Sequence, residues 1–269
     1  MKLQHIVAAL ALAASGAASA NVLDPQVTTN LGGEMSLTVY SVSTQASVLI
    51  DTGVMLADFR NIFGAAGAKS YNLDLSGNTA FNSFLALAGN AADIRFTFFG
   101  GDNNGVSAAT RTMITTVSGD ATAVTNGNMV DSMNAFKANY LDAANLKPAI
   151  NPTLGGQANG SLLAIKGQDG NAYFMENTNP TFRGNFVDTS AAIGSSVAIY
   201  DFVRSSTSAL GNATESSLMG VDGVAVAKLA LGATGGYKFT VSAVPEPTTY
   251  ALAIAGLALV GVAARRRRA

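Results

Sequence analysis

The side chains that could do chemistry in this sequence are mostly carboxylates. Its 269 residues include 17 Asp and Glu residues, no cysteine and a single histidine, His5, near the first residue. Without another His or any Cys, the rest of the chain cannot form Ser-His-Asp or Cys-His nucleophilic sites. Ligation of zinc, copper, haem or an iron–sulfur cluster through imidazole or thiolate is excluded there as well.

A pair of carboxylates could still catalyse glycoside hydrolysis. Glu34, Glu176 and Glu215 are available together with 13 aspartates, but no local motif pairs them, and solvated surface acids account for them better. There is no tryptophan to form a sugar platform. Three tyrosines with polar neighbours could substitute, although core or strand positions are the simpler interpretation: Tyr71, Tyr173 and Tyr200. We therefore expect a protein that is not an enzyme.

Two short segments are rich in the oxygen ligands that Ca²⁺ prefers. Gly100–Gly105 contains Asp102 and Asn104, and Gln168–Asn171 contains Asp169. Their spacing does not match an EF-hand loop, and both segments are typical of ordinary tight turns. We expect no cofactor and no metal, with Ca²⁺ at these three side chains as the alternative.

Strand-length runs of apolar and β-branched residues, bounded by Gly, Asn, Asp or Ser, must position these side chains. The sequence predicts strands at Met35–Tyr40, Ala46–Ile50, Ile94–Phe99, Arg111–Val117, Leu162–Lys166, Ala172–Glu176, Val197–Val203, Val224–Leu231 and Tyr237–Val241. Ile165–Tyr173 is expected to form a hairpin closed through Asp169-Gly170. Leu229–Phe239 is expected to form a second hairpin, which turns at Gly232–Gly236.

Two segments have helical rather than strand spacing, Thr79–Ala88 and Asn128–Leu146. The second carries an apolar stripe that we interpret as a core face: Met129, Met133, Phe136, Tyr140 and Leu141. Spaced strands with one or two inserted helices predict a mainly β single domain, a β-sandwich or a jelly-roll-like fold. The best candidate for an internal boundary, Asn151–Gly160, is interpreted as a loop.

The charge of the central region excludes a nucleic-acid footprint. Between the two terminal segments, residues 21–243 carry 11 basic and 16 acidic side chains, a net charge of −5. The basic residues are scattered and form no patch, so we expect no binding to nucleic acid. We refer to residues 21–243 as the body.

The first 20 residues have the three parts of a secretory signal peptide. Lys2 and His5 precede an apolar run from Ile6 to Ala14, and the small residues Ala18 and Ala20 follow. Such an apolar run is too short to cross a bilayer about 30 Å thick. We expect signal peptidase to cleave after Ala20, which places the body outside the inner membrane.

The last 26 residues have a comparable order of parts. The segment Pro245-Glu246-Pro247 precedes an uncharged apolar stretch, about residues 248–264, that is expected to form a transmembrane helix. A cluster of four arginines then follows: Arg265, Arg266, Arg267 and Arg268. Basic flanks stay in the cytoplasm, so this end agrees with export of the body.

Residues Val244–Ala269, the tail, resemble the PEP-CTERM sorting signal in the order Pro-Glu-Pro, short apolar helix and terminal arginines. The resemblance implies recognition by exosortase, a membrane enzyme of Gram-negative bacteria that make exopolysaccharide, with removal of the tail near the Pro-Glu-Pro segment. It also implies release to the cell surface or the extracellular matrix. A plain membrane anchor that is never processed is the alternative.

The function expected from the sequence is that of a non-enzymatic surface or matrix protein associated with exopolysaccharide or biofilm. Its partners would be signal peptidase, exosortase, the inner membrane before processing and the polysaccharide itself. Two alternatives remain open for the body: a carbohydrate-binding module and a carboxylate-only glycosidase.

Overall fold

The computed structural model describes residues 22–26, 32–64, 70–89, 92–104, 111–142, 161–168, 172–218, 224–233 and 235–244. The predicted signal peptide, the candidate boundary at 151–160 and the tail from Pro245 onward lie outside the described residues. Within the described part, no helix combines the length and the apolar character that a bilayer span requires.

Eleven strands form one antiparallel sheet in the described ranges. Their bounds are β1 (Glu34–Ser41), β2 (Ala46–Met55), β3 (Ser70–Asp74), β4 (Arg95–Asp102), β5 (Thr112–Val117), β6 (Leu162–Ile165), β7 (Ala191–Ala192), β8 (Ser196–Val203), β9 (Thr214–Ser217), β10 (Val224–Leu231) and β11 (Tyr237–Val244). The main order is β3-β11-β10-β8-β5-β4-β1-β2-β6, with β7 paired to β4 and β9 paired to β8. The mainly β class predicted from the sequence is confirmed.

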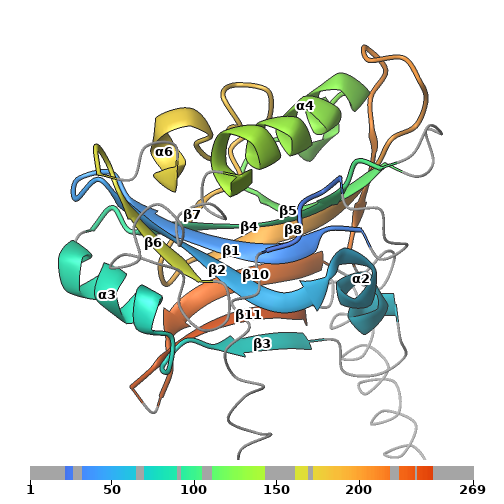
Figure 1. Ribbon diagram of the computed structural model, residues 1–269. Coiled ribbons are helices and arrows are strands. Elements are labelled where there is room, and N and C mark those ends of the chain that lie inside the picture. The colour runs from blue at the N-terminus through green and yellow to red at the C-terminus, as the bar shows by residue number, and fades with distance from the viewer. Residues whose placement is uncertain are drawn as a thin grey trace, which may run out of the picture.

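The sheet curls so that β10, β11 and β3 lie beneath β1, β2 and β4 (Figure 1). Apolar side chains from the two halves meet in an inner core, in which the rings of Phe98 on β4 and Phe239 on β11 are 4.7 Å apart. Two helices complete this core, α2 (Leu56–Gly64) and α3 (Thr79–Ala88). One curled sheet therefore provides the two-layer packing expected of a sandwich.

Alternation along the strands decides which side chains enter the inner core. Along β10 the burial alternates, with Ala225, Ala227 and Leu229 buried and their neighbours more exposed. α3 begins where Asn78 accepts a hydrogen bond from the N–H of Phe81 at 2.9 Å, an N-cap contact that satisfies a free helix donor. Both features follow from local sequence, and the predicted bounds of α3 are confirmed.

The opposite, outer face of the sheet carries a second apolar core and different covering elements. They are η2 (Ala121–Ala123), α4 (Asn126–Phe136), the π-helix η3 (Lys137–Leu141) and α6 (Phe174–Asn177). Figure 1 shows α4 and α6 on the same side of the sheet, away from α3. The apolar stripe predicted for the long helix does face this core, with Met129, Met133, Phe136, Tyr140 and Leu141 buried.

Three predictions about local structure need correction. The run Ala172–Glu176 is not a strand, because Phe174 starts the short helix α6 and its N–H donates to Ser47 Oγ on β2 at 3.0 Å. The hairpin predicted over Ile165–Tyr173 is therefore wrong, and β6 pairs with β2 instead. The long predicted helix changes to π geometry at Lys137. In addition, the spacing of apolar residues in the sequence did not indicate α2, β3, β7 or β9. Packing against the sheet decided these elements.

The remaining predicted strands are confirmed with small shifts of their ends. The hairpin over Leu229–Phe239 is formed by β10 and β11, in which Leu231 pairs with Tyr237. The N–H of Gly232 donates to the carbonyl of Gly236 at 2.6 Å and closes the turn.

Candidate functional site

An irregular segment, Thr178–Ser190, runs over the outer face from α6 to β7, and we call it the crossing segment. Three of its residues that are not glycine have left-handed backbones: Asn179, Phe182 and Arg183, with φ of +58°, +46° and +64°. This region is uncommon for residues with a side chain and costs on the order of 1 kcal/mol or more each. Such geometry persists only where the surroundings hold it in place.

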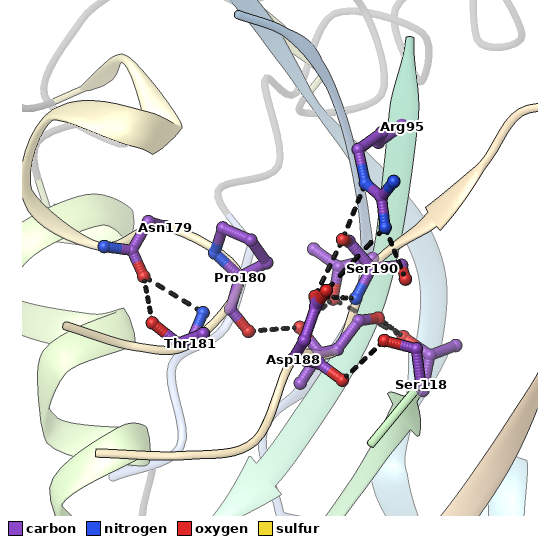
Figure 2. A network of polar contacts seen from close by, with 10 residues as sticks. Arg95, Ser118, Asn179, Pro180, Thr181, Asp188 and Ser190 are labelled. Carbon is purple, nitrogen blue, oxygen red and sulfur yellow. Dashed lines mark hydrogen bonds and ion pairs between the residues drawn. The ribbon is translucent and has the colours of Figure 1, made fainter. Parts of the chain in front are cut away.

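The side chain of Asn179 holds the first turn of the crossing segment. Its Oδ1 accepts hydrogen bonds from the N–H and the Oγ1 of Thr181 at 3.0 and 2.8 Å, and from the N–H of Arg183 at 3.2 Å. The contacts between Asn179 and Thr181 are visible in Figure 2. Phe182 is fully buried, and its ring lies 5.2 Å from that of Phe99 on β4. Polar and apolar contacts together fix the left-handed backbone.

A charged network anchors the other end of the crossing segment (Figure 2). Arg95 donates through Nε to Ser190 Oγ at 2.9 Å and through a terminal nitrogen to the Ser190 carbonyl at 3.1 Å. The Ser190 hydroxyl in turn donates to Asp188 at 2.8 Å, and the Arg95 guanidinium lies 3.7 Å from the same carboxylate. Ser118 donates from its N–H to the Asp188 carbonyl at 2.8 Å. These bonds connect the segment to β4 and to the end of β5.

Buried threonines continue the same network into the sheet. Thr97 donates its hydroxyl to Thr189 Oγ1 at 2.8 Å, and Thr116 donates to the Thr189 carbonyl at 2.5 Å. The Thr189 hydroxyl in turn donates a hydrogen bond to the carbonyl of Pro180 at 2.8 Å. All three threonines are almost inaccessible to solvent. Buried hydroxyls with complete partners restrict the backbone strongly, so the crossing segment is a rigid part of the outer face.

The wall opposite the crossing segment is the second unusual backbone feature. After α4 the chain continues as the π-helix η3, a rare geometry that is frequent at functional sites. Tyr140 of this turn is fully buried with its hydroxyl 3.4 Å from Thr38 Oγ1, and burial raises the pKa of that phenol. The π turn leaves Ala138 and Asn139 toward the surface.

Between these two walls lies a groove of about 500 Å³. Its polar lining comes from α4, η3 and the crossing segment: Asp131, Asn134, Asn139, Arg183 and Asn185. A smaller hollow of about 170 Å³ shares Asn185 and is lined also by Asn128 and Phe186. The helical wall formed by α4 and η3 and the strained crossing segment thus line one polar concavity.

Four of the lining side chains have free hydrogen-bonding capacity. Within the described part of the chain, the side chains of Asp131, Asn139, Arg183 and Asn185 form no hydrogen bond or ion pair. Carboxylate, amide and guanidinium groups offer both donors and acceptors. The groove can therefore exchange several hydrogen bonds with a polar ligand that presents hydroxyl groups. The sequence carried no signal for it, because its two walls are distant in the chain.

The carboxylates singled out in the sequence do not converge on this groove. The carboxyl group of Glu34 lies beside that of Asp51 on the neighbouring strand β2. Burial, followed by the hydrogen bond and the negative charge of Asp51, raises the pKa of Glu34 to about 7. Glu176 lies 3.8 Å from Lys166, and Glu215 is a residue of β9. The Glu34–Asp51 contact depends on strand register and therefore has no signal in the sequence.

The tyrosines considered as sugar platforms are divided between the two faces. Tyr71 belongs to the inner core, where its ring lies 5.4 Å from that of Phe59. Tyr173 is buried, which together with the charge of Glu176 raises its pKa to about 12. Tyr200 packs at the edge of the outer core. None of the three lines the groove.

The residues considered for Ca²⁺ are partly described. Asp102 closes a tight turn at the end of β4 by accepting the N–H of Asn104 at 2.9 Å, and burial raises the pKa of its carboxyl. Asp169 lies outside the described residues. In the described ranges, no group of three or more His, Cys, Asp or Glu side chains is placed to hold a metal ion. Ca²⁺ at these positions stays a prediction.

The predicted processing residues also lie outside the described ranges: Ala18, Ala20, Pro245, Glu246, Pro247, Arg265, Arg266, Arg267 and Arg268. The body is described up to Val244, the last residue of β11. The Pro-Glu-Pro segment therefore follows immediately after a strand of the central sheet.

Comparison with known proteins identifies the tail. Residues 243–268 match the family model described as the PEP-CTERM protein-sorting motif, which confirms the resemblance seen in the sequence. The motif implies export, processing by exosortase and sorting to the cell surface. No curated protein and no solved structure matches the chain.

Proposed function

We propose that this chain is a non-enzymatic protein of the cell surface or extracellular matrix that binds a hydroxyl-rich polysaccharide through the groove between α4–η3 and the crossing segment. The match of its tail to the sorting motif supports delivery to the place where exopolysaccharide accumulates. The polar groove supplies a surface on which such a polymer can bind.

The route to the surface has three steps. First, signal peptidase cleaves after Ala20. The apolar tail then holds the body on the outer side of the inner membrane, with the arginines in the cytoplasm. Finally, exosortase removes the tail near Pro245-Glu246-Pro247. Because β11 ends at Val244, cleavage in the Pro-Glu-Pro segment leaves every hydrogen bond of the sheet in place. The body can therefore be released without unfolding.

The observation that carries the binding function is the set of unpartnered side chains in the groove. Asp131 accepts hydrogen bonds, Arg183 donates them, and Asn139 and Asn185 do both. Sugar hydroxyls also donate and accept, so each ring can engage several of these groups. The groove is shallow and open to solvent, which suits a polymer lying on the surface better than a small molecule, which needs an enclosed pocket.

The arrangement of acids favours binding over catalysis. Glycoside hydrolysis needs two carboxyl groups about 5–9 Å apart with the sugar between them. Glu34 and Asp51 lie side by side on adjacent strands, and neither lines the groove. Asp131 is the single acid of the groove among the described residues. A glycosidase remains the second hypothesis.

The binding function is tested with the exported protein and exopolysaccharide purified from the producing cells. We expect Arg183→Ala and Asn139→Ala each to weaken retention on immobilised polysaccharide about tenfold, and the double variant to abolish it. Asp58→Asn, an exposed carboxylate of α2 on the other face of the sheet, is the matched control. Equal retention of the double variant and the control would disprove the assignment to this groove.

The sorting route is tested in cells. Replacing Pro245, Glu246 and Pro247 by alanine, or removing the exosortase, should leave a larger, membrane-bound form that still carries the arginine cluster. Mass spectrometry of both termini distinguishes the forms. A protein of unchanged size released from the exosortase-deficient strain would support the plain anchor or another protease instead.

A further inference from the structure

The first described residues of the body form a docked segment, Val22–Gln26, which we call the strap. Val22 is buried in the outer core. Leu23 exchanges two hydrogen bonds with Glu34 at the start of β1, since its carbonyl accepts the Glu34 N–H at 2.9 Å and its own N–H donates to the Glu34 carboxylate at 3.1 Å. The carbonyl of Pro25 accepts the N–H of Asn103 at 2.6 Å. The strap therefore bridges β1 and the end of β4.

Two glycines make room for the strap, Gly33 just before β1 and Gly101 in β4. A Cβ on Gly33 would lie 2.8 Å from the carbonyl oxygen of Asp24, a distance that real side chains do not adopt. A Cβ on Gly101 would lie 2.7 Å from Met133 Sδ and 3.4 Å from Pro25. The strap, β4 and α4 are thus in close contact at this point, and a side chain at Gly33 would collide with backbone atoms.

The strap also touches the wall of the groove. Gln26 Nε2 donates to Asn134 Oδ1 at 3.1 Å, and Asn134 also accepts from Asn103 Nδ2 at 2.8 Å. Asp24 lies 3.7 Å from Lys137, the first residue of η3. Lys137 is held by Asp142 at 2.9 Å and by Asp24, and both carboxylates raise the pKa of its ammonium group. These contacts converge where α4 changes to π geometry.

The other end of α4 is held by different residues. Thr125 caps the helix in a reciprocal capping box with Asn128. Asn126 donates to Ser205 Oγ at 3.1 Å, and the N–H of Gly127 donates to the carbonyl of Ala209 at 2.9 Å. The N-terminal end of α4 is thus anchored to the loop after β8, whereas the strap contacts its C-terminal end.

We propose that the strap is a positioning device for the groove: residues 22–26 fix the junction of α4 and η3 and thereby place Asn134 and Asn139 opposite Arg183. This inference rests on the proposed binding function for its biological purpose, but its structural part is independent. It assigns Asp24 and Gln26 as positioning residues that reach the ligand site through Lys137 and Asn134.

The position of the strap in the chain couples it to maturation. It begins two residues after the expected cleavage site at Ala20, so a single residue separates the signal peptide from the buried Val22, and the extended chain from Ala20 to Val22 spans at most about 7 Å. A signal segment still inside the bilayer would draw the strap toward the membrane. If signal peptidase cleaves after Ala20 as expected, stable docking of the strap follows this cleavage.

The test compares exported full-chain variants by hydrogen exchange and by polysaccharide retention. We expect Asp24→Asn combined with Gln26→Ala to accelerate exchange of backbone amides over residues 134–142 about tenfold. Exchange over residues 126–130 should stay unchanged, because the capping box and the loop after β8 hold that end. Polysaccharide affinity should fall several-fold. Gly33→Ala, whose Cβ would press on the carbonyls of Asp24 and Gly101 without altering any side chain of the strap, should have the same effects.

Each outcome has a defined meaning. Unchanged exchange over residues 134–142 in both variants overturns the proposal. Faster exchange with unaltered polysaccharide affinity overturns the positioning role. If the wild-type protein retains no polysaccharide while exchange rises in the variants, the proposed binding function fails and the strap's structural role stands. Asp58→Asn serves again as the control, and it should leave both measurements unchanged.

Discussion

The two faces of the curled sheet are built in different ways. On the inner face, Phe98 lies between the rings of Phe59 and Phe239, with centroids 5.2 and 4.7 Å away. A bidentate ion pair joins Arg60 of α2 to Asp201 of β8 at 2.6 and 2.9 Å. The outer face is covered instead by α4 with its π-helical continuation η3, the four-residue helix α6 and the crossing segment with its left-handed residues.

This difference separates stability from binding. Regular helices and strands satisfy their own backbone groups, so the inner face is closed by apolar packing. The crossing segment needs side chains such as Asn179 and Thr189 to complete its hydrogen bonds, and it retains strained residues. Strain that the surroundings hold in place is typical of functional sites. We infer that the inner face supplies most of the folding free energy and that the outer face supplies the ligand contacts.

The largest expected effect comes from the inner face. Phe98→Ala removes a fully buried ring that contacts residues of α2 and β11, and we expect it to lower the free energy of unfolding by about 3–5 kcal/mol. Phe186→Ala, on the outer face next to the smaller hollow, should cost less because its cavity opens to solvent. Urea denaturation of both variants measures the difference. Equal losses would contradict the separation of roles.

The next effect concerns the strained backbone. Asn179→Ala removes an acceptor of three hydrogen bonds and leaves, at a φ of +58°, an alanine whose side chain forms no hydrogen bond to offset the strain. We therefore expect the free energy of unfolding to fall by about 2 kcal/mol. Asn179→Gly loses the same hydrogen bonds but adopts this φ freely. Thermal or chemical denaturation should therefore show a smaller loss of unfolding free energy for Asn179→Gly than for Asn179→Ala. A larger loss for the glycine variant than for the alanine variant would show that strain in the left-handed backbone does not cause the loss of stability.

A smaller effect is expected from pH. The pKa of Glu34, raised from 4.5 to about 7 mainly by burial and then by Asp51, means that the folded state keeps a proton that the unfolded chain has lost. Stability contributed by this proton is fully present below pH 4.5 and is lost as the pH rises to 7. Because Glu34 is half-exposed, we expect about 1–2 kcal/mol after allowing for solvent screening.

Glu34→Gln provides the check on that pH dependence. The amide cannot ionise, so the unfolding free energy of this variant should vary less between pH 4.5 and 7, and at pH 8 the variant should match or exceed the wild type. Denaturation series over this range measure the slopes. Parallel curves for the two proteins would exclude Glu34 as the titrating group.

The smallest effect on stability is predicted where the effect on binding is greatest. Arg183→Gly relieves a left-handed φ of +64° and removes a side chain without a described partner, so we expect a gain of about 0.5 kcal/mol. Retention on polysaccharide should nevertheless fall at least tenfold. If Arg183→Gly were less stable than the wild type and equally well retained on polysaccharide, Arg183 would contribute to stability and not to binding.

The sequence predicted those elements whose boundaries depend on nearby residues. The hairpin of β10 and β11 followed from alternation and a glycine-rich turn, and α3 followed from apolar spacing. The sorting motif was recognisable because its three parts are contiguous in the tail. Local chemistry was sufficient in each case, since the partners of each residue are its neighbours in the chain.

Other features depend on residues that are distant in the sequence. Ala172–Glu176 has the composition of a strand, yet Phe174 packs against Tyr40 at 5.3 Å and the segment becomes helical. The carboxyl pair of Glu34 and Asp51 depends on a register shift between β1 and β2 that no composition indicates.

By itself, the sequence determined that the protein is mainly β, that it lacks imidazole and thiolate chemistry outside the N-terminal segment, and that its tail carries a sorting motif. Tertiary structure alone decided that Asp131 and Asn139 line one groove with Arg183, and that the strap reaches Lys137. The reason is physical: a motif needs only its own residues, whereas a groove exists only after two distant segments have packed on the same face of the sheet.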